Sequence, residues 1–522
     1  MLTHVSWSAL ALQSITYISS IGFVTLLCLA IYRLTFHPLA KYPGPLIGRL
    51  TDFYSVYQAY AGERHLDFYK LHQKYGKVVR YGPNSISINS NIALSEIYGF
   101  KSNVKKAHFY SAFPAQKGAW STHSAIDKSL HARKRRVLSQ AFSDAAMRGL
   151  QPHILSVIRT FTEVIGDFPS PLGLNGEKKA TGEWSEPKNM GRYANYMSYD
   201  VLGDVCYGES FDTLESPDNR FAVDLVALSS KYHFLTAQMP DLKKLGLHRV
   251  LFPDLLAQRT RFMGYSRARL QKRMQLGTDT DRRDFFYFLL NAKDPETGLG
   301  FSTQELWGES NVLLIAGSDT TSTAFSATFF YLLHYPGYLK DLTKLVRQTF
   351  DDVEEIELGQ KLNDLKLLRA CIDEAMRLSP PVPGLLPREV LEGGMDIDGM
   401  HFPMGTVVGV PIYALHHNSV YHPQPFVYDP SRFIAGNEKA GSDRVKLTQS
   451  AFCPFSIGSR GCIGKGVAYL ELTVALARTL WLYDMKLVDS ATGAGPDGNY
   501  ALKDIFVAEK TGPLVQFRRR AT

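Results

Sequence analysis

The stretch that decides the fold of this sequence is Phe455-Ser-Ile-Gly458-Ser-Arg460-Gly-Cys462-Ile-Gly464. Its glycines let the backbone approach a flat, bulky group closely. Cys462 precedes a helical pattern that runs from Val467 to Ala477, and the amide end of a helix favours a thiolate. Arg460 offers a planar fork of donors that suits a carboxylate. This stretch predicts a loop that presents a thiolate and an arginine to a large flat group.

A long apolar segment upstream carries glycine and hydroxyl groups in its middle. Ser302-Thr-Gln-Glu305 predicts a capping box at its start, and the pattern persists to about Tyr335, before Pro336. A helix this long and apolar is expected to cross the interior. Ala316-Gly317-Ser-Asp319-Thr320-Thr321 lies near its centre, where such residues loosen the hydrogen-bond ladder. Taken alone, the segment reads as a helix with a few satisfied hydroxyls.

Two further patterns place charged groups on shared helix faces. Glu374 and Arg377 are three residues apart, in a helix predicted to be capped by Asn363 or Asp364 and ended by Pro380-Pro381. The run His131-Ala-Arg-Lys-Arg135 places its first and last residues on one side of a helix. That run also fits a solvated basic face.

Together, and in this order along the chain, the patterns resemble those of the cytochrome P-450 family. The cysteine stretch matches the family's haem-binding signature FxxGxRxCxG, Glu374-Ala-Met-Arg377 matches its ExxR pair, and the segment around Thr320 matches its oxygen-activation motif. The resemblance runs from the N-terminal segment to the last helix. It implies a mainly α fold with small β-sheets, built as one large domain.

The resemblance also implies a role for each matched residue. Cys462 would be the axial ligand of the haem iron, within a haem-binding loop that includes Phe455, Gly458, Arg460 and Gly464. The haem propionates would be held by His131, Arg135 and Arg388. Thr320 would hydrogen-bond the dioxygen, Asp319 would relay protons, and Gly317 would leave room for the gas. The loop under the haem would be positioned by a structural cluster of Glu374, Arg377 and Arg432.

The sequence departs from the family pattern at two of these places. Ser431 stands where the family usually has glutamate, just before Arg432. His131 stands where tryptophan is more common. Neither change removes the arginine that makes the expected contact, so the assignments are kept.

Composition narrows the class of protein. The chain has 522 residues, 45% of them hydrophobic and 21% charged, which is ordinary for a globular protein. Its five cysteines are scattered without a CxxC pair or zinc spacing, which fits a domain on the reducing side of a membrane. The net charge of +8 is spread without a long basic tract. A nucleic-acid partner is therefore not expected. The positive charge is instead expected to form a basic face toward a membrane or an acidic protein.

The N-terminus is predicted to be a membrane anchor. Residues 1–32 contain no Lys, Arg, Asp or Glu, and a helix from Trp7 to Ile31 would span roughly 37 Å, enough to cross a bilayer. A cleavable signal peptide is the alternative, although no basic start or clear cleavage site supports it. Residues 33–45 form a proline-rich hinge, and residues 46–522 form the haem-thiolate monooxygenase domain. Arg33 and Lys41 favour a cytoplasmic domain on the endoplasmic reticulum.

The coarse pattern elsewhere predicts two strands at 77–83 and 85–89, then mostly helix. Polar loops are predicted at 169–191, 274–283, 435–446 and 489–499. The substrate cavity is expected to be lined by segments near 109–120, 312–316 and 382–386, all apolar or aromatic. The segment Leu245-Gly-Leu-His-Arg-Val-Leu-Phe252 is predicted either to dip into the membrane or to end a core helix.

The resemblance implies a haem b cofactor and monooxygenase chemistry on a hydrophobic small molecule, with NADPH used indirectly. Electrons would come from an NADPH–cytochrome reductase, and cytochrome b5 is an additional candidate partner. The hinge and the run from His131 to Ser143 are similar to those of filamentous-fungal members that act in secondary-metabolite biosynthesis. Two alternatives stay open at this point: a haem-thiolate isomerase or dehydratase, and a non-enzymatic membrane haem protein.

Overall fold

Helix α14, Thr303–His334, crosses the interior and organises the helices around it. The computed structural model describes residues 7–114, 116, 118–168, 182–277, 284–436 and 439–520. In this part of the chain α14 is buried along most of its length and packs against α8 (Met190–Leu202), α17 (Lys366–Leu378) and α20 (Lys465–Leu482). The Ser302 capping box is present, and the helix stops before Tyr335 as predicted.

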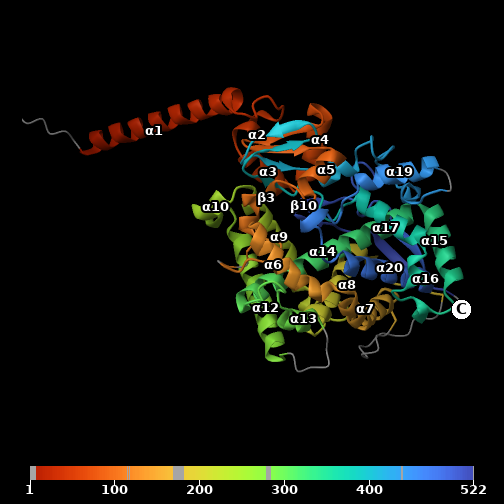
Figure 1. The fold of residues 1–522 in the computed structure, drawn as a ribbon. Helices are drawn as coiled ribbons and strands as arrows, with labels where there is room; N and C mark the ends of the chain where they lie inside the picture. Colours follow the sequence, from red (N-terminus) through yellow and green to blue (C-terminus); the bar gives the residue numbers. More distant parts are fainter. Residues whose placement is uncertain are drawn as a thin grey trace, which may run out of the picture.

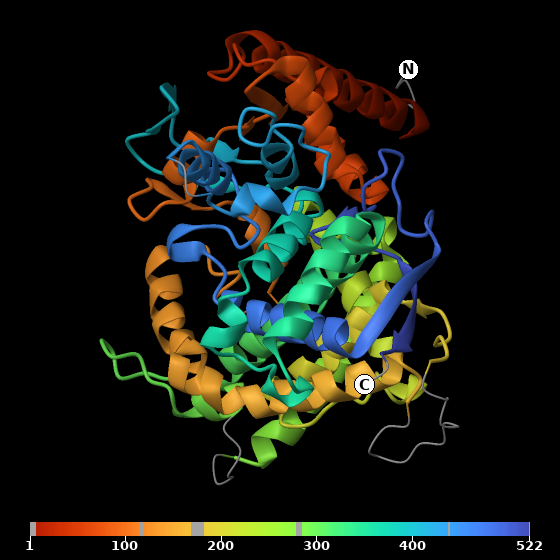
Figure 2. The same ribbon diagram turned by 90° about the vertical axis from the view of Figure 1, so that its right-hand side faces the viewer.

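Most of the other helices form the body below the sheet region in Figure 1 and Figure 2, while the helices within residues 7–98 lie beside that region or lead away from it. Their bounds are α1 Trp7–Ile31, α2 Leu46–Leu50, α3 Phe53–Ala61, α4 Arg64–Tyr75, α5 Asn91–Tyr98, α6 Lys128–Ser139, α7 Asp144–Ile165, α9 Phe221–Gln238, α10 Asp241–Lys244, α11 His248–Leu251, α12 Pro253–Gln275, α13 Phe285–Asn291, α15 Pro336–Thr349, α16 Gln360–Asn363, α18 Ile412–His416 and α19 Lys439–Ser450.

The strands form small sheets, the largest of which has the order β1-β2-β8-β5-β3. In it the two predicted strands, β1 and β2, pair antiparallel, with Val79 opposite Ser87, while β2 and β8 run parallel. The bounds are β1 Val78–Gly82, β2 Ser85–Ile88, β3 Val104–Lys106, β4 Lys188–Asn189, β5 Arg388–Val390, β6 Met395–Ile397, β7 Met400–Phe402, β8 Val407–Gly409, β9 Tyr483–Asp489, β10 Lys503–Ile505, β11 Val507–Glu509 and β12 Leu514–Arg519.

Two local predictions are wrong. The stretch 435–446 was expected to be a loop, but α19 starts at Lys439 and continues to Ser450, because its Lys- and Arg-containing sequence propagates a helix despite Gly441. Helix α17 starts after Leu365 without a side-chain cap, since the short helix α16 takes up the proposed capping residues. The predicted loops at 169–191 and 274–283 lie partly outside the described residues.

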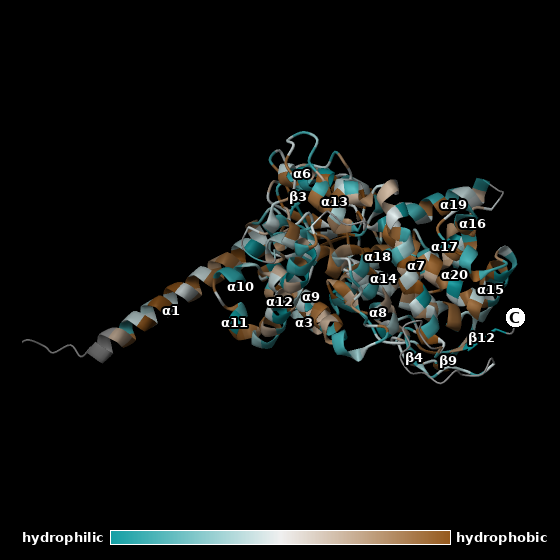
Figure 3. Cartoon of the chain, turned by 90° about the horizontal axis from the view of Figure 1, so that it is seen from below, coloured by the Kyte–Doolittle hydropathy of each residue, from teal (hydrophilic) through white to brown (hydrophobic). Residues whose placement is uncertain are grey.

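The N-terminal helix stands apart from the body. Figure 1 and Figure 3 show α1 leading away from the folded domain, and its apolar side chains are exposed to the surroundings. The span Ala11–Phe36 has a mean hydropathy of 2.0, so it is long and apolar enough to cross a membrane. One π-helical turn, Tyr32–Phe36, extends the helix into the predicted hinge, and the chain turns at His37.

Candidate active site

Cys462 lies in the wall of an internal cavity of about 330 Å³. It sits between the 3₁₀ turn Gly458–Arg460 and helix α20, and its backbone N–H donates to the Phe455 carbonyl at 2.8 Å. The side chain is reached from the cavity, while the surrounding protein desolvates the thiol and raises its pKa. Two amides at the start of α20 and the charge of Arg135 lower that pKa. The loop therefore offsets part of the cost of a thiolate.

Two glycines of this loop, Gly458 and Gly464, serve different steric purposes. Gly458 has a φ of +70°, and a Cβ placed there would lie 2.0 Å from the carbonyl oxygen of Tyr98 at the end of α5. Gly464 meets no such obstacle, because the nearest atom to its Cβ would be Cys462 Sγ at 3.9 Å. Gly458 thus allows the loop to pack against α5, and Gly464 keeps space beside the thiol.

Replacing Gly458 with alanine is expected to destabilise the protein by at least about 2 kcal/mol, since the clash is with backbone and the φ is left-handed. Gly466→Ala is the matched control, because that glycine lies in α20 with open space around it. It should be neutral or stabilising by up to about 1 kcal/mol. Thermal unfolding of the two variants, followed by circular dichroism, compares them. Equal melting temperatures would contradict the expected clash.

The centre of α14 borders the cavity through Gly317, Thr320 and Thr321. The Thr320 hydroxyl donates to the Ala316 carbonyl at 2.6 Å, so it remains bound to its own helix. A Cβ on Gly317 would lie 2.7 Å from Leu202 Cδ1, on α8. The glycine therefore gives the Leu202 side chain room against α14, in addition to the space that it leaves at the cavity.

Asp319 lies on a different face of α14 from the cavity-lining residues. Its carboxyl is buried, its Oδ2 atom has no hydrogen-bond partner among the described residues, and burial raises its pKa. Lys510 acts against that shift. The Lys510 ammonium donates to Ser322 Oγ at 2.6 Å and to Asn195 Oδ1 at 2.5 Å. The predicted partners Asp319 and Thr320 are consecutive but do not share one wall.

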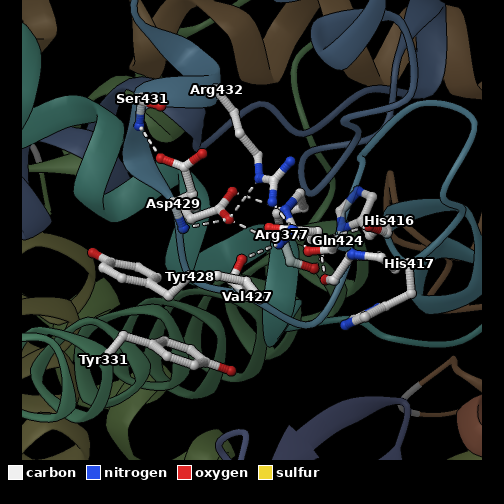
Figure 4. Close-up of polar contacts among 12 residues, drawn as sticks. Tyr331, Arg377, His416, His417, Gln424, Val427, Tyr428, Asp429, Ser431 and Arg432 are labelled. Atoms are coloured by element: carbon white, nitrogen blue, oxygen red, sulfur yellow. Dashed lines mark hydrogen bonds and ion pairs between the residues drawn. The ribbon is translucent and has the colours of Figure 1, made fainter.

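The structure brings Glu374, Arg377 and Arg432 together, and Figure 4 shows the two arginines with the polar contacts around them. Arg377 donates to both oxygens of Glu374 at 2.8 Å, and Arg432 Nε donates to the same carboxylate at 3.3 Å. Both side chains of the first pair are fully buried. Arg377 also donates to the carbonyls of His416 and Pro425, at 2.8 and 2.7 Å. The cluster thus ties α17 to the chain that leads toward the cysteine loop.

Basic side chains gather at one end of the cavity, namely His131, Arg135, Arg460 and Lys106, and Arg388 joins them from an adjoining pocket that these four also line. His131 and Arg135 both face inward from α6, as their spacing predicted. Burial, together with the four cations beside it, lowers the pKa of His131 to about 2. This excess of mutually repelling cations fits a group that carries two carboxylates.

Several members of this basic cluster also hold the loops in place. Arg135 donates to the Gly461 carbonyl at 2.8 Å, and Arg460 donates to the Ala125 carbonyl at 2.7 Å. Lys106 donates to the His123 carbonyl. Sequence reasoning missed Lys106, because a single lysine in β3 has no pattern that distinguishes it from a surface residue.

The three apolar segments predicted to line the cavity do so, through Phe113 and Ala119, Val312 to Ala316, and Val382 and Leu386. The structure adds His233 from α9 and Phe506 from the C-terminal hairpin β10–β11. Phe506 has a φ of +84°, a region that costs a bulky residue energy. Its amide donates to Asp504 at 3.1 Å, which helps to hold the tip.

A family model described as Cytochrome P450 matches residues 38–497. The chain belongs to the cytochrome P450 family. It is 37% identical to the cytochrome P450 monooxygenase poxM of Penicillium oxalicum, over 94% of this chain and 92% of that protein. It is 38% identical to the cytochrome P450 monooxygenase apf7 of Gibberella fujikuroi, over 95% and 97%. These matches make this P450 a monooxygenase enzyme, which removes support from the non-enzymatic alternative.

The fold agrees with this assignment. A solved structure titled as the haem domain of cytochrome P450DA superposes with a TM-score of 0.69, at 18% identity, over 88% of this chain and 93% of that one. Membership of the family implies a haem-thiolate centre, a redox partner and a small-molecule substrate. The residues present fit that group: a cavity-facing thiol, a glycine beside it and a basic cluster for two carboxylates.

Proposed function

We propose that this P450 binds haem b through Cys462 and inserts one oxygen atom of O₂ into a hydrophobic small molecule, by hydroxylation, epoxidation or a related oxidation. The observation that supports this most is a single cavity with Cys462 in one wall, Thr320 in another and apolar side chains over much of the rest. When bound, haem with a thiolate ligand supplies the oxidising chemistry and favours O–O cleavage. The chain's own residues bind and orient the substrate and deliver protons.

Each group of residues has its place in this proposal. Phe455, Gly458, Arg460 and Gly464 shape the loop that carries the thiolate, and His131, Arg135, Arg388 and Lys106 hold the two propionates. The Glu374 cluster keeps that loop in position. Thr320 offers its hydroxyl in the cavity wall, and Asp319 brings protons to it from the Lys510 side of α14. Asp319 must turn toward Thr320 for this transfer, because it lies on another face of the helix.

We propose that the electrons come from NADPH through a membrane-bound NADPH–cytochrome reductase, with cytochrome b5 as a second donor. The net charge of +8 supports attraction to partners with acidic surfaces. Because the relatives come from filamentous fungi, we place the reaction in the biosynthesis of a fungal secondary metabolite.

Isotope labelling tests the reaction. The full chain is expressed with a fungal reductase in yeast and supplied with an extract from a fungal strain in which this gene is deleted. Under ¹⁸O₂ with NADPH, a new product should carry one labelled oxygen, and its unoxidised form should be consumed. A product that forms equally without NADPH, or one without the label, would favour the isomerase or dehydratase alternative.

We propose a single-pass anchor in the endoplasmic reticulum with the domain in the cytoplasm. Helix α1 supplies the span, and Arg33 follows it. The segment 245–252 supports the same arrangement, because Leu245, Val250 and Leu251 are exposed rather than packed in a core. Figure 3 shows α10 and α11 on the side of the body from which α1 leaves, and Figure 1 shows the same for α10. Both features would then face one bilayer.

Removing residues 1–36 is expected to release only part of the protein from microsomes, since the exposed apolar segment 245–252 remains. Adding Val250→Asp to the truncated chain should move nearly all of it to the soluble fraction. The measurement is the distribution between pellet and supernatant after ultracentrifugation. Full-length Val250→Asp is the control and should stay in the pellet. Complete release by truncation alone would exclude a membrane contact at 245–252.

A further inference from the structure

We propose that His123 and Asn311 are polar recognition points of the substrate cavity, and that the substrate is an apolar molecule carrying a hydrogen-bond donor such as a hydroxyl or an amide N–H. The inference rests on the proposed function, because it takes the cavity beside Cys462 as the substrate pocket. It adds a substrate class to a cavity otherwise described as apolar.

The first observation is a pair of unsatisfied polar atoms. His123 and Asn311 both line the cavity, and His123 Nε2 and Asn311 Oδ1 are inaccessible to bulk solvent. Neither atom has a hydrogen-bond partner in the described part of the chain. A buried polar atom without a partner costs about 1–3 kcal/mol, and most such atoms in folded proteins are bonded. A ligand in the cavity that draws these two side chains toward it and bonds the two atoms would recover that cost.

The loop that carries His123 is fixed on both sides. Thr122 donates its amide and its hydroxyl to Glu309 Oε1, at 2.7 and 2.9 Å, which ties the loop to α14. Lys106 donates to the His123 carbonyl from β3. The imidazole also contacts two cavity-lining rings, Phe113 at 5.1 Å and Phe506 at 5.5 Å between centroids. The side chain is thus held in the wall rather than free to turn outward.

The chemistry of the two atoms defines the ligand group. Burial and the cations Lys106 and Arg388 lower the pKa of His123, so its ring is neutral and offers one N–H and one lone pair. Asn311 donates its Nδ2 to the Trp307 carbonyl at 2.8 Å, which leaves Oδ1 as an acceptor. Asn311 Oδ1 therefore requires a hydrogen-bond donor on the ligand. The neutral His123 ring can pair with either a donor or an acceptor. A plain hydrocarbon or a carboxylate satisfies Asn311 poorly.

Ligand pairs that differ in one polar group test this proposal. The haem-loaded full chain is titrated with decane, decan-1-ol and decanamide, and binding is followed by the shift of the Soret band. The quantity of interest is the ratio of the decane dissociation constant to that of each polar probe. Asn311→Leu should lower this ratio about tenfold for both polar probes, and His123→Phe should lower it for at least one.

Asn291→Leu is the matched control, because Asn291 makes the same bond to a carbonyl four residues earlier, at 2.8 Å, but lies exposed on α13. Its ratios should equal those of the unmodified protein. Unchanged ratios in Asn311→Leu would overturn the proposal. A His123→Phe variant that loses haem on gel filtration would assign His123 to a haem propionate. That result would overturn its proposed role in substrate recognition. If the unmodified protein gives no thiolate-type carbon monoxide spectrum, the proposed function fails instead.

Discussion

Cys462→Ala is expected to lower the rate of NADPH-dependent oxidation by at least about a thousandfold. It should also remove the strongly red-shifted Soret band of the reduced carbon monoxide complex. The expectation follows from the position of the thiol in the cavity wall, with the charge of Arg135 and two amides directed toward it. In the proposed site the remaining residues bind the cofactor's periphery. The variant should therefore retain some haem while losing the spectrum that reports a thiolate ligand.

Cys453→Ala is the matched control for this experiment. Cys453 lies in the same connection, nine positions before Cys462, but it is buried outside the cavity lining, and its backbone N–H donates to His416 Nε2 at 3.0 Å. Alanine keeps that backbone bond. This variant should show the same carbon monoxide spectrum and rate as the unmodified protein. A red-shifted band that survives in Cys462→Ala and disappears in Cys453→Ala would exchange the roles of the two cysteines.

Glu374→Gln is expected to lower the free energy of unfolding by about 3–5 kcal/mol, because it leaves two arginines buried beside a neutral amide. Arg377 would keep its bonds to backbone carbonyls but would lose its charge partner. The expected result is a protein that binds haem weakly, because the chain leading to the cysteine loop is no longer held. Thermal unfolding and the haem content per chain measure the two effects.

Asp224→Asn provides the comparison. Its partner Arg192 and Asp224 itself are each about half exposed, so the pair should contribute less than about 1 kcal/mol. If Glu374→Gln changes neither stability nor haem content more than this surface variant does, the buried cluster does not hold the loop. A variant with normal stability that no longer binds haem would instead show that the cluster positions the loop without stabilising the fold.

The sequence predicted those features that depend on local spacing. The capping box of α14, the shared faces of His131 with Arg135 and of Glu374 with Arg377, and the strands around Gly82 all follow from periodicity. The cysteine loop could be recognised because its glycines and arginine occur at fixed distances from Cys462.

Features that depend on distant packing could not be read in this way. Lys106 and His123 reach the cavity because β3 pairs with β5 and the segment before α6 is bonded to α14. Phe506 reaches it because a hairpin near the C-terminus returns to the centre. The orientation of Asp319 was missed because the matched motif gives its place in the chain and not the face on which it points. The helix α19 shows that a polar composition alone does not make a loop.

The left-handed backbone at Phe506 has a consequence for anyone who wishes to redirect this enzyme. Glycine would relax the tip of the β10–β11 hairpin and enlarge the cavity, but it would also remove a ring that packs against Phe113 at 5.1 Å and Phe234 at 6.3 Å between centroids. Libraries screened for a chosen product should keep an aromatic ring there or vary it together with Phe113. Backbone conformation and cavity packing thus favour different residues at this one position, so a library varied there is best screened for product and for heat tolerance together.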